Sequence, residues 1–197
     1  MLKFRRVVPL LALLLTACQP KHEPSSDSEM EVFIEGLMKK MTLDEKIGQL
    51  NLPGAGDIVT GQSSSSDIGK RIKEGKVGGI LNLKSVDKIR DVQKVAVEES
   101  RLGIPLIFGR DVIHGYRTVA PIPLGMAATW APDLIEAANT IAAQEARADG
   151  IHWGFSPMLD IARDPRWGRV AEGFGEDPCL AGKLAAAAVQ GFQGNDQ

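Results

Sequence analysis

The chain has 197 residues, of which 44% are hydrophobic and 24% are charged, and its formal net charge is −2. This is the composition of an ordinary globular protein with enough apolar residues to form a core. The slightly acidic balance argues against nucleic-acid binding, which needs a basic surface, and against a basic patch that would hold the protein on anionic lipid.

Residues 1–17 are expected to form an export signal. A basic start is followed by an apolar run over residues 7–15, which is too short to span a bilayer. The run ends in the letters LTAC, which resemble the lipobox of bacterial lipoproteins, where the cysteine becomes the lipidated first residue. We therefore expect a lipid anchor on Cys18, a flexible tether over residues 18–29 and a periplasmic or cell-surface location. An ordinary signal peptide is the alternative, and Cys179 is expected to be a packed, inert thiol.

The segment after the tether is expected to be helical at first and then irregular. Residues 30–39 have the apolar spacing of an amphipathic helix. A second helix is predicted to begin at Thr42, because the letters TLDE have the form of a capping box. Residues 53–66 are rich in proline, glycine and serine and are expected to be a loop, whereas residues 67–74 can form a short helix.

Strand and helix patterns then alternate along the chain. Apolar runs bounded by turn residues predict strands over residues 78–83, 104–109 and 151–157. Helices are predicted to follow them over residues 85–101, 132–149 and 180–192. Ser85 is expected to cap the first of these helices, and Pro132 has the position of a first helical residue.

Three strand–helix units in a row predict an α/β fold with a parallel sheet. Apolar strands of this kind are expected to be covered on both faces. The order fits either a (β/α)8 barrel or a doubly wound sheet, and both carry their functional residues at the C-terminal ends of the strands.

Asp111 directly follows the second expected strand, within the letters GRDVIHGYRT. One interpretation is a metal site with Asp111 and His114 as ligands, joined by His152 in a metal-dependent hydrolase. A second is a carboxylate that only orders its own loop. A third is sugar binding, because an ionised carboxylate accepts hydrogen bonds and adjacent sugar hydroxyls donate them.

Residues 161–178, IARDPRWGRVAEGFGEDP, are expected to be neither helix nor strand. Alternating arginines and carboxylates predict a loop braced by charge-assisted pairs. Arg169 is the exception, because such a loop could aim its guanidinium into a pocket where it would meet two neighbouring ring oxygens. Trp167 is expected to pack on the core, with a sugar-stacking surface as the alternative. The expected braces are Arg163, Asp164, Arg166, Glu176 and Asp177.

The chain resembles glycoside hydrolase family three in segments that run in order. These segments are MTLDEKIGQL, VGGILN, IPLIFGRDVIHGYRT, PIPLGMAATW, FSPMLDIARDPRWGRVAEGFGEDP and VQGFQG. They cover residues 30–194, and the RDPRWGR and EGFGEDP run is highly specific. The sequence also lacks GxxxxGK[ST], GxSxG and HExxH, the motifs of nucleotide binding, serine hydrolysis and zinc peptidases.

The resemblance implies a (β/α)8 TIM-barrel-type N-terminal domain that needs no cofactor. It implies retaining hydrolysis of terminal β-D-glucosyl residues from β-linked oligosaccharides or aryl glucosides, with a β-xylosidase as the alternative within the family. It places Asp111 and Arg169 on hydroxyls of the terminal sugar and Glu172 at the rim of that pocket.

The resemblance also implies that parts of the enzyme lie beyond this chain. The family's nucleophile and acid/base are expected after residue 197, so residues 30–197 should hold neither catalytic residue nor metal and only about three units of the barrel. We therefore expect this chain alone to be inactive. A non-catalytic sugar-binding lipoprotein is the alternative of a different class.

Overall fold

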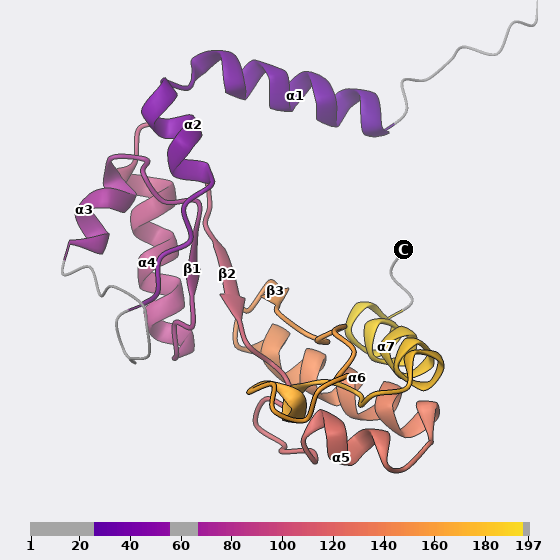
Figure 1. Cartoon of the computed structure of the whole chain (residues 1–197). Coiled ribbons are helices and arrows are strands. Elements are labelled where there is room, and N and C mark those ends of the chain that lie inside the picture. Colours follow the sequence, from indigo (N-terminus) through magenta and orange to yellow (C-terminus); the bar gives the residue numbers. More distant parts are fainter. Residues whose placement is uncertain (1–25, 56–66, 195–197) are drawn as a thin grey trace, which may run out of the picture. The chain divides into compact units, whose positions relative to one another are not determined.

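A computed structural model describes residues 26–55 and 67–194 (Figure 1). The chain divides into two compact units, residues 1–40 and residues 41–197. In the first unit the described element is helix α1 (Ser26–Lys40), so residues 26–29 of the expected tether are helical. The expected export signal and Cys18 lie outside the described residues. No described helix is long and apolar enough to cross a bilayer.

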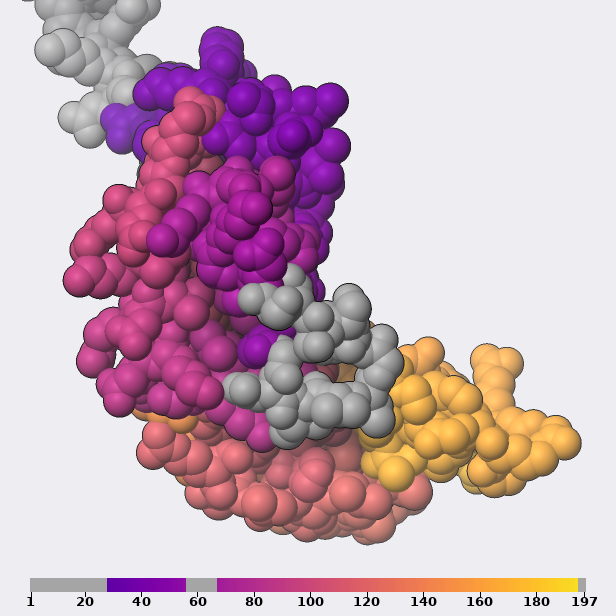
Figure 2. Space-filling view, turned by 90° about the vertical axis from the view of Figure 1, so that its left-hand side faces the viewer, coloured from indigo at the N-terminus to yellow at the C-terminus, as the bar shows by residue number. Residues whose placement is uncertain are grey.

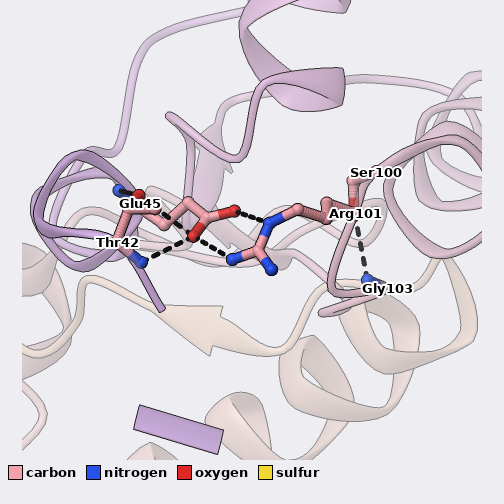
Figure 3. Close-up of polar contacts among 5 residues, drawn as sticks. All are labelled: Thr42, Glu45, Ser100, Arg101 and Gly103. Atoms are coloured by element: carbon pink, nitrogen blue, oxygen red, sulfur yellow. Dashed lines mark hydrogen bonds and ion pairs between the residues drawn. The ribbon is translucent and has the colours of Figure 1, made fainter. Parts of the chain in front are cut away.

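The second unit starts with helix α2 (Leu43–Gln49), which has the expected capping box. Thr42 Oγ1 accepts the Glu45 N–H at 3.2 Å, and the Glu45 carboxylate accepts the Thr42 N–H at 2.8 Å. The same carboxylate binds Arg101 (Figure 3), with Nε–Oε1 at 2.9 Å and Nη2–Oε2 at 2.6 Å. Glu45 is buried, and its bonds with Arg101 and Thr42 lower its pKa to about 2. Arg101 thereby ties α2 to the segment after α4 (Val86–Glu99).

The sheet confirms the expected α/β fold with parallel strands. Its order is β1-β2-β3, formed by β1 (Gly79–Leu81), β2 (Ile107–Arg110) and β3 (Trp153–Gly154). Both neighbouring pairs are parallel, with Gly79 beside Ile107 and Gly109 beside Trp153. The three described strands form an open sheet (Figure 1), so they supply part of an α/β architecture rather than a closed barrel.

The strands are shorter than the apolar runs that predicted them. The second begins at Ile107 rather than residue 104, because Pro105 has no N–H and the backbone of Leu106 is bound by a side chain. Gln93 of α4 accepts the Leu106 N–H at 2.8 Å and donates to its carbonyl at 3.2 Å. In the third strand the ladder bonds cover only residues 152–155.

The outer edge of β1 is covered by the start of the expected loop. Leu81 donates its N–H to the Pro53 carbonyl at 2.9 Å and accepts the Ala55 N–H at 3.0 Å. Gly54 and Leu81 form an isolated parallel bridge. The chain therefore runs beside β1 at this point, and residues 56–66 of the expected loop lie outside the described part.

The expected helices are present, and one further α-helix and a short 3₁₀ helix were missed. The expected ones are α3 (Ile68–Lys73), α4, α6 (Pro132–Ala148) and α7 (Pro178–Gln193). Helix α3 packs on α4, and both lie on the side turned toward the viewer in Figure 2. The unexpected α-helix is α5 (Pro123–Ala127), whose letters PLGMA are too few, and too rich in proline and glycine, to show a helical period.

Two helix starts and one thiol differ from expectation. Ser85 has a φ of +85° and makes no side-chain cap bond, because an N-cap hydroxyl reaches the first turn from an extended backbone. Helix α7 begins at Pro178 rather than residue 180, and Asp177 caps it by accepting the Leu180 N–H at 2.6 Å. Cys179 is exposed rather than packed.

Two clusters of buried apolar side chains hold the second unit together. The first joins the sheet to α3, α4 and α6 and is centred on Phe108, whose side chain is fully buried. The second joins α5, α6 and α7 and is centred on Leu184, which is also fully buried. Burial of each such side chain stabilises the fold by roughly 1.5–3 kcal/mol. Helix α6 contributes Ala142 to the first cluster and Ile135 to the second, and so connects them.

One face of the sheet is open, which corrects the expectation that both faces are covered. Side chains alternate along a strand, so Phe108 points into the core whereas Ile107 points the other way and is 50% exposed. Trp153 is similarly 49% exposed. Phe155 lies against Gly109, where a Cβ atom would come within 2.8 Å of the Phe155 ring. Gly109 therefore lets this aromatic side chain lie over β2.

Helices α6 and α7 approach each other backbone to backbone at Gly191. A Cβ atom at this position would lie 2.4 Å from the Glu136 carbonyl oxygen and 2.9 Å from Asn139 Cβ. Gly182 of the same helix would meet nothing within 4 Å. Only a residue without a side chain fits at Gly191, so this glycine sets how closely the two helices pack.

Candidate functional site

Polar side chains gather where the strands end. Asn82 follows β1 and Asp111 follows β2, and the Asn82 N–H continues the ladder by donating to the Gly109 carbonyl at 2.8 Å. Asn82 Nδ2 donates to Asp111 Oδ2 at 3.2 Å, and Asn82 Oδ1 accepts the Asp111 N–H at 3.4 Å. Asp111 is exposed, so the rest of its carboxylate is open to a ligand.

The loop after Asp111 turns sharply at Gly115. Its φ of +102° is a left-handed value that favours glycine, and a Cβ atom there would lie 1.9 Å from the Thr118 carbonyl oxygen. His114 Nδ1 donates to the Ala120 carbonyl at 3.0 Å across this turn. The histidine therefore helps to close the loop.

Two carboxylates at the C-terminal end of α6, Glu145 within the helix and Asp149 directly after it, hold the same loop. Glu145 accepts the Arg117 N–H and the Thr118 N–H at 2.8 Å each, and the Thr118 hydroxyl at 2.6 Å. Asp149 accepts the Tyr116 hydroxyl at 2.9 Å and pairs with the Arg117 guanidinium. The hydrogen bonds from Thr118 and Arg117 lower the pKa of Glu145, and burial together with the bond to Asp149 raises the pKa of Tyr116. The loop that begins at Asp111 is thus anchored to a helix.

The metal interpretation receives no support from the described residues. His152 Nδ1 accepts the Phe108 N–H at 3.3 Å, and His114 Nδ1 is bound to Ala120, so each ring keeps only Nε2 for other partners. Within residues 26–55 and 67–194 no group of three or more histidine, cysteine, aspartate or glutamate side chains could hold a metal ion.

The charged loop over residues 161–178 is braced by two local pairs, and only the first of them joins residues that were expected to act as braces. Asp177 caps α7 instead, and Arg169, which was expected to be the exception, forms the second pair. Arg166 binds both oxygens of Asp164, with Nε–Oδ1 at 3.0 Å and Nη2–Oδ2 at 2.6 Å. Arg169 binds both oxygens of Glu172, with Nε–Oε1 at 2.9 Å and Nη2–Oε2 at 2.7 Å. The second pair spans the short 3₁₀ helix η1 (Val170–Glu172), and Trp167 beside it is half-buried.

Arg169 does not directly follow β3, but it lies within electrostatic reach of the strand ends. Its bond with Glu172 chiefly raises its pKa, and the charges of Asp160 and Asp111 raise it further. The Arg169 side chain is 59% exposed, although Glu172 occupies Nε and one N–H of Nη2. A guanidinium has five N–H donors, so the edge formed by Nη1 and Nη2 remains for a ligand.

Glu172 faces Arg169, which affects what chemistry it can perform. Both of its carboxylate oxygens accept hydrogen bonds from the guanidinium, and these bonds lower its pKa. A carboxyl group that acts as a general acid needs a raised pKa. The arrangement therefore suits Glu172 to orienting Arg169 rather than to donating a proton.

Two polar residues near the site were missed by sequence reasoning. Asn82 lies within the apolar run that predicted the first strand, and no short motif marks an asparagine in that position. Asp160 lies between β3 and the charged loop, and no motif sets its carboxylate apart from those that follow in the loop. Its effect on Arg169 depends on folding that local spacing does not reveal.

Comparisons with known proteins agree with one another. The profile of the family described as "Glycosyl hydrolase family 3 N terminal domain" matches residues 42–196. A periplasmic beta-glucosidase of Salmonella typhimurium is 42% identical over 88% of this chain and 22% of its own length. A lysosomal beta glucosidase of Dictyostelium discoideum is 33% identical over 86% of this chain and 24% of its own length.

A solved structure gives the same result in three dimensions. The beta-glucosidase from Listeria innocua, crystallised in complex with isofagomine, superposes with a TM-score of 0.75 at 40% identity. The superposition covers 84% of this chain and 23% of that one. The chain therefore spans less than a quarter of the length of these relatives.

Proposed function

Because the chain belongs to glycosyl hydrolase family 3 through the N-terminal domain of that family, we propose that it supplies part of the sugar subsite of a retaining β-glucosidase. The substrate class is a β-linked oligosaccharide or aryl glucoside with a terminal glucosyl residue. We also propose that the domain is part of a (β/α)8 barrel. The relatives support it because they carry the β-glucosidase name at 33–42% identity.

The observation that carries this proposal is an acceptor at the end of β2 with a donor within electrostatic reach of it. Asp111 offers an exposed carboxylate, and Arg169 offers the free edge of an exposed guanidinium. A sugar ring presents adjacent hydroxyls that both donate and accept hydrogen bonds, so the two groups can hold neighbouring oxygens. Glu172 fixes the arginine at the rim of this subsite.

The test measures the binding of methyl β-D-glucopyranoside to the chain by NMR titration. We expect Asp111→Ala to weaken binding by about 10- to 100-fold, since a hydrogen bond to a charged group contributes roughly 1.5–3 kcal/mol. The control is Glu98→Ala, which removes an exposed carboxylate paired with Lys94 on α4. Equal affinities for Asp111→Ala and the wild type would contradict the proposal.

Hydrolysis is measured in parallel with 4-nitrophenyl β-D-glucopyranoside and β-D-xylopyranoside. We expect no turnover by this chain, because retaining hydrolysis needs a proton-donating carboxyl group and Glu172 is held ionised by Arg169. Turnover that disappears in Glu172→Gln or Glu176→Gln would place the catalytic carboxylates in the charged loop and refute this view. The xyloside tests for the β-xylosidase alternative, since xylose lacks the hydroxymethyl group of glucose.

We also propose that the protein is exported and anchored by lipid on Cys18. The support is the LTAC sequence after a short apolar run, together with the similarity to a periplasmic relative. Labelled palmitate should be incorporated by the wild type and by Cys179→Ser, which changes the other cysteine. Labelling that persists in Cys18→Ser would exclude the anchor.

A further inference from the structure

Asn82 occupies an unusual backbone position between two strand ends. It directly follows β1, and its φ of +59° lies in the left-handed region, which asparagine tolerates better than most residues. Its N–H donates to the Gly109 carbonyl, so this turn of the backbone still belongs to the pairing of β1 with β2. The side chain is thereby directed toward Asp111 at the start of the neighbouring loop.

The Asn82 amide binds Asp111 twice. It donates from Nδ2 to the carboxylate oxygen Oδ2 at 3.2 Å and accepts the backbone N–H of Asp111 at 3.4 Å. One amide therefore holds both the backbone and the side chain of the same residue. The reverse orientation of the amide would place its oxygen against a carboxylate, so the two contacts together fix how the amide lies.

We infer that Asn82 is a positioning residue that aims the Asp111 carboxylate at the sugar, an inference that rests on the proposed function. By occupying Oδ2 on one side, the amide leaves Oδ1 and the remaining lone pair of Oδ2 for hydroxyl donors. A neutral amide does this without repelling the carboxylate or the sugar. The aspartate is then held in place before the sugar arrives, which lowers the entropy cost of binding.

Charge explains why an amide and not a carboxylate stands at this position. Asn82→Asp would keep the size of the side chain and its tolerance for a left-handed backbone, but it would place two negative groups side by side. Asn82→Gly would adopt the same left-handed backbone conformation without strain and would remove the side chain. The two variants therefore separate a role of Asn82 in the backbone turn from a role in holding Asp111.

The experiment compares the wild type, Asn82→Gly, Asn82→Asp and Asp111→Ala in the full chain. Affinity for methyl β-D-glucopyranoside is measured by NMR titration and melting temperature by circular dichroism. We expect Asn82→Gly to bind about 2- to 10-fold more weakly, the value of one hydrogen bond, and Asn82→Asp to bind more weakly still. The melting temperatures should stay close to that of the wild type, which shows that the variants fold.

A salt series adds a readout that a purely structural role would not move. Between about 0.05 and 0.5 M sodium chloride, screening should restore part of the affinity of Asn82→Asp, since its defect is repulsion between exposed carboxylates. Asn82→Gly has no such repulsion, and its affinity should not recover.

The outcomes separate the inference from the proposed function. If Asp111→Ala loses sugar binding while both Asn82 variants bind like the wild type, the positioning role is refuted and the subsite stands. If Asn82→Gly binds normally and Asn82→Asp is weak without any salt dependence, the positioning role is refuted as well. If the wild type does not bind the glucoside, the proposed function fails, and the inference that rests on it fails too.

Discussion

Two arginine–glutamate pairs in this protein have almost the same geometry and very different surroundings. Arg101 meets Glu45 at 2.9 and 2.6 Å, and Arg169 meets Glu172 at 2.9 and 2.7 Å. The first pair joins residues 56 positions apart, whereas the second closes a single turn of three residues. The Glu45 side chain is 9% exposed and that of Glu172 is 30% exposed.

The difference teaches that pair geometry alone does not reveal what a pair does. The buried Glu45 also accepts two hydrogen bonds from Thr42 at the start of α2. Its pair with Arg101 therefore joins this helix to a distant part of the chain. Glu172 has the guanidinium of Arg169 as its hydrogen-bonding partner. This pair lies within electrostatic reach of the strand ends, because the charges of Asp160 and Asp111 raise the pKa of Arg169. Burial and sequence separation indicate that the Arg101–Glu45 pair holds distant segments together, whereas the Arg169–Glu172 pair orients the arginine that we propose to bind sugar.

The largest expected effect tests the pair of Arg101 and Glu45. Arg101→Ala leaves a buried carboxylate without its guanidinium, so we expect a marked fall in melting temperature and little change in glucoside affinity. Lys94→Ala, which breaks an exposed pair with Glu98, should melt close to the wild type. Circular dichroism measures both, and equal melting temperatures for the two variants would remove the distinction between the pairs.

The second effect is the reverse pattern at the other pair. Arg169→Ala should weaken binding of methyl β-D-glucopyranoside by about 10- to 100-fold and change the melting temperature little. The matched control is Arg166→Ala, which removes an equally bidentate arginine from the same loop. A loss of affinity of the same size in both variants would show that the loop, and not Arg169, is responsible.

A third effect concerns acid. The pKa of Glu45 is lowered from 4.5 to about 2 by Arg101 and Thr42. A carboxylate with a depressed pKa stabilises the folded state above its unfolded pKa, and this contribution is lost as the pH falls from about 4.5 to about 2. Urea denaturation of the wild type should show this loss. Glu45→Gln should be less stable at neutral pH and should lack this component, whereas parallel pH profiles would contradict the assignment.

The smallest effect concerns the capping box, in which Glu45 takes part and Glu172 does not. Thr42→Ala removes the hydroxyl that binds the Glu45 N–H and carboxylate, so it should cost about 1 kcal/mol of stability. Thr42→Ser keeps the hydroxyl and serves as the control. Chemical denaturation measures the difference, and an unchanged midpoint in Thr42→Ala would show that Arg101 alone holds Glu45.

Local patterns predicted the parts of this fold that local forces decide. The TLDE letters predicted the capping box at Thr42, because both of its hydrogen bonds lie within one helical turn. Pro132 was placed correctly at the start of α6, because its fixed φ and missing N–H suit the first helical position. The alternation of apolar runs and helical patterns predicted parallel strands, since the connections between them leave few other topologies.

Features that depend on distant contacts escaped prediction. Glu45 and Arg101 carry no pattern that links them across the chain, and Asn82 reaches Asp111 only after β1 and β2 pair. The start of β2 depends on Gln93, a helix residue whose side chain takes the place of a strand partner. At the site, the roles of Asp111, Arg169 and Glu172 came from family resemblance and remain predictions.

The close approach at Gly191 has a consequence for the local unfolding of this protein. Helices α6 and α7 meet backbone to backbone there, so no flexible side chain can swing aside to let them part gradually. The two helices should therefore open together, as one cooperative unit of local unfolding. In a deuterium-uptake experiment, their amides should exchange at a shared rate and more slowly than those of the short helix α3.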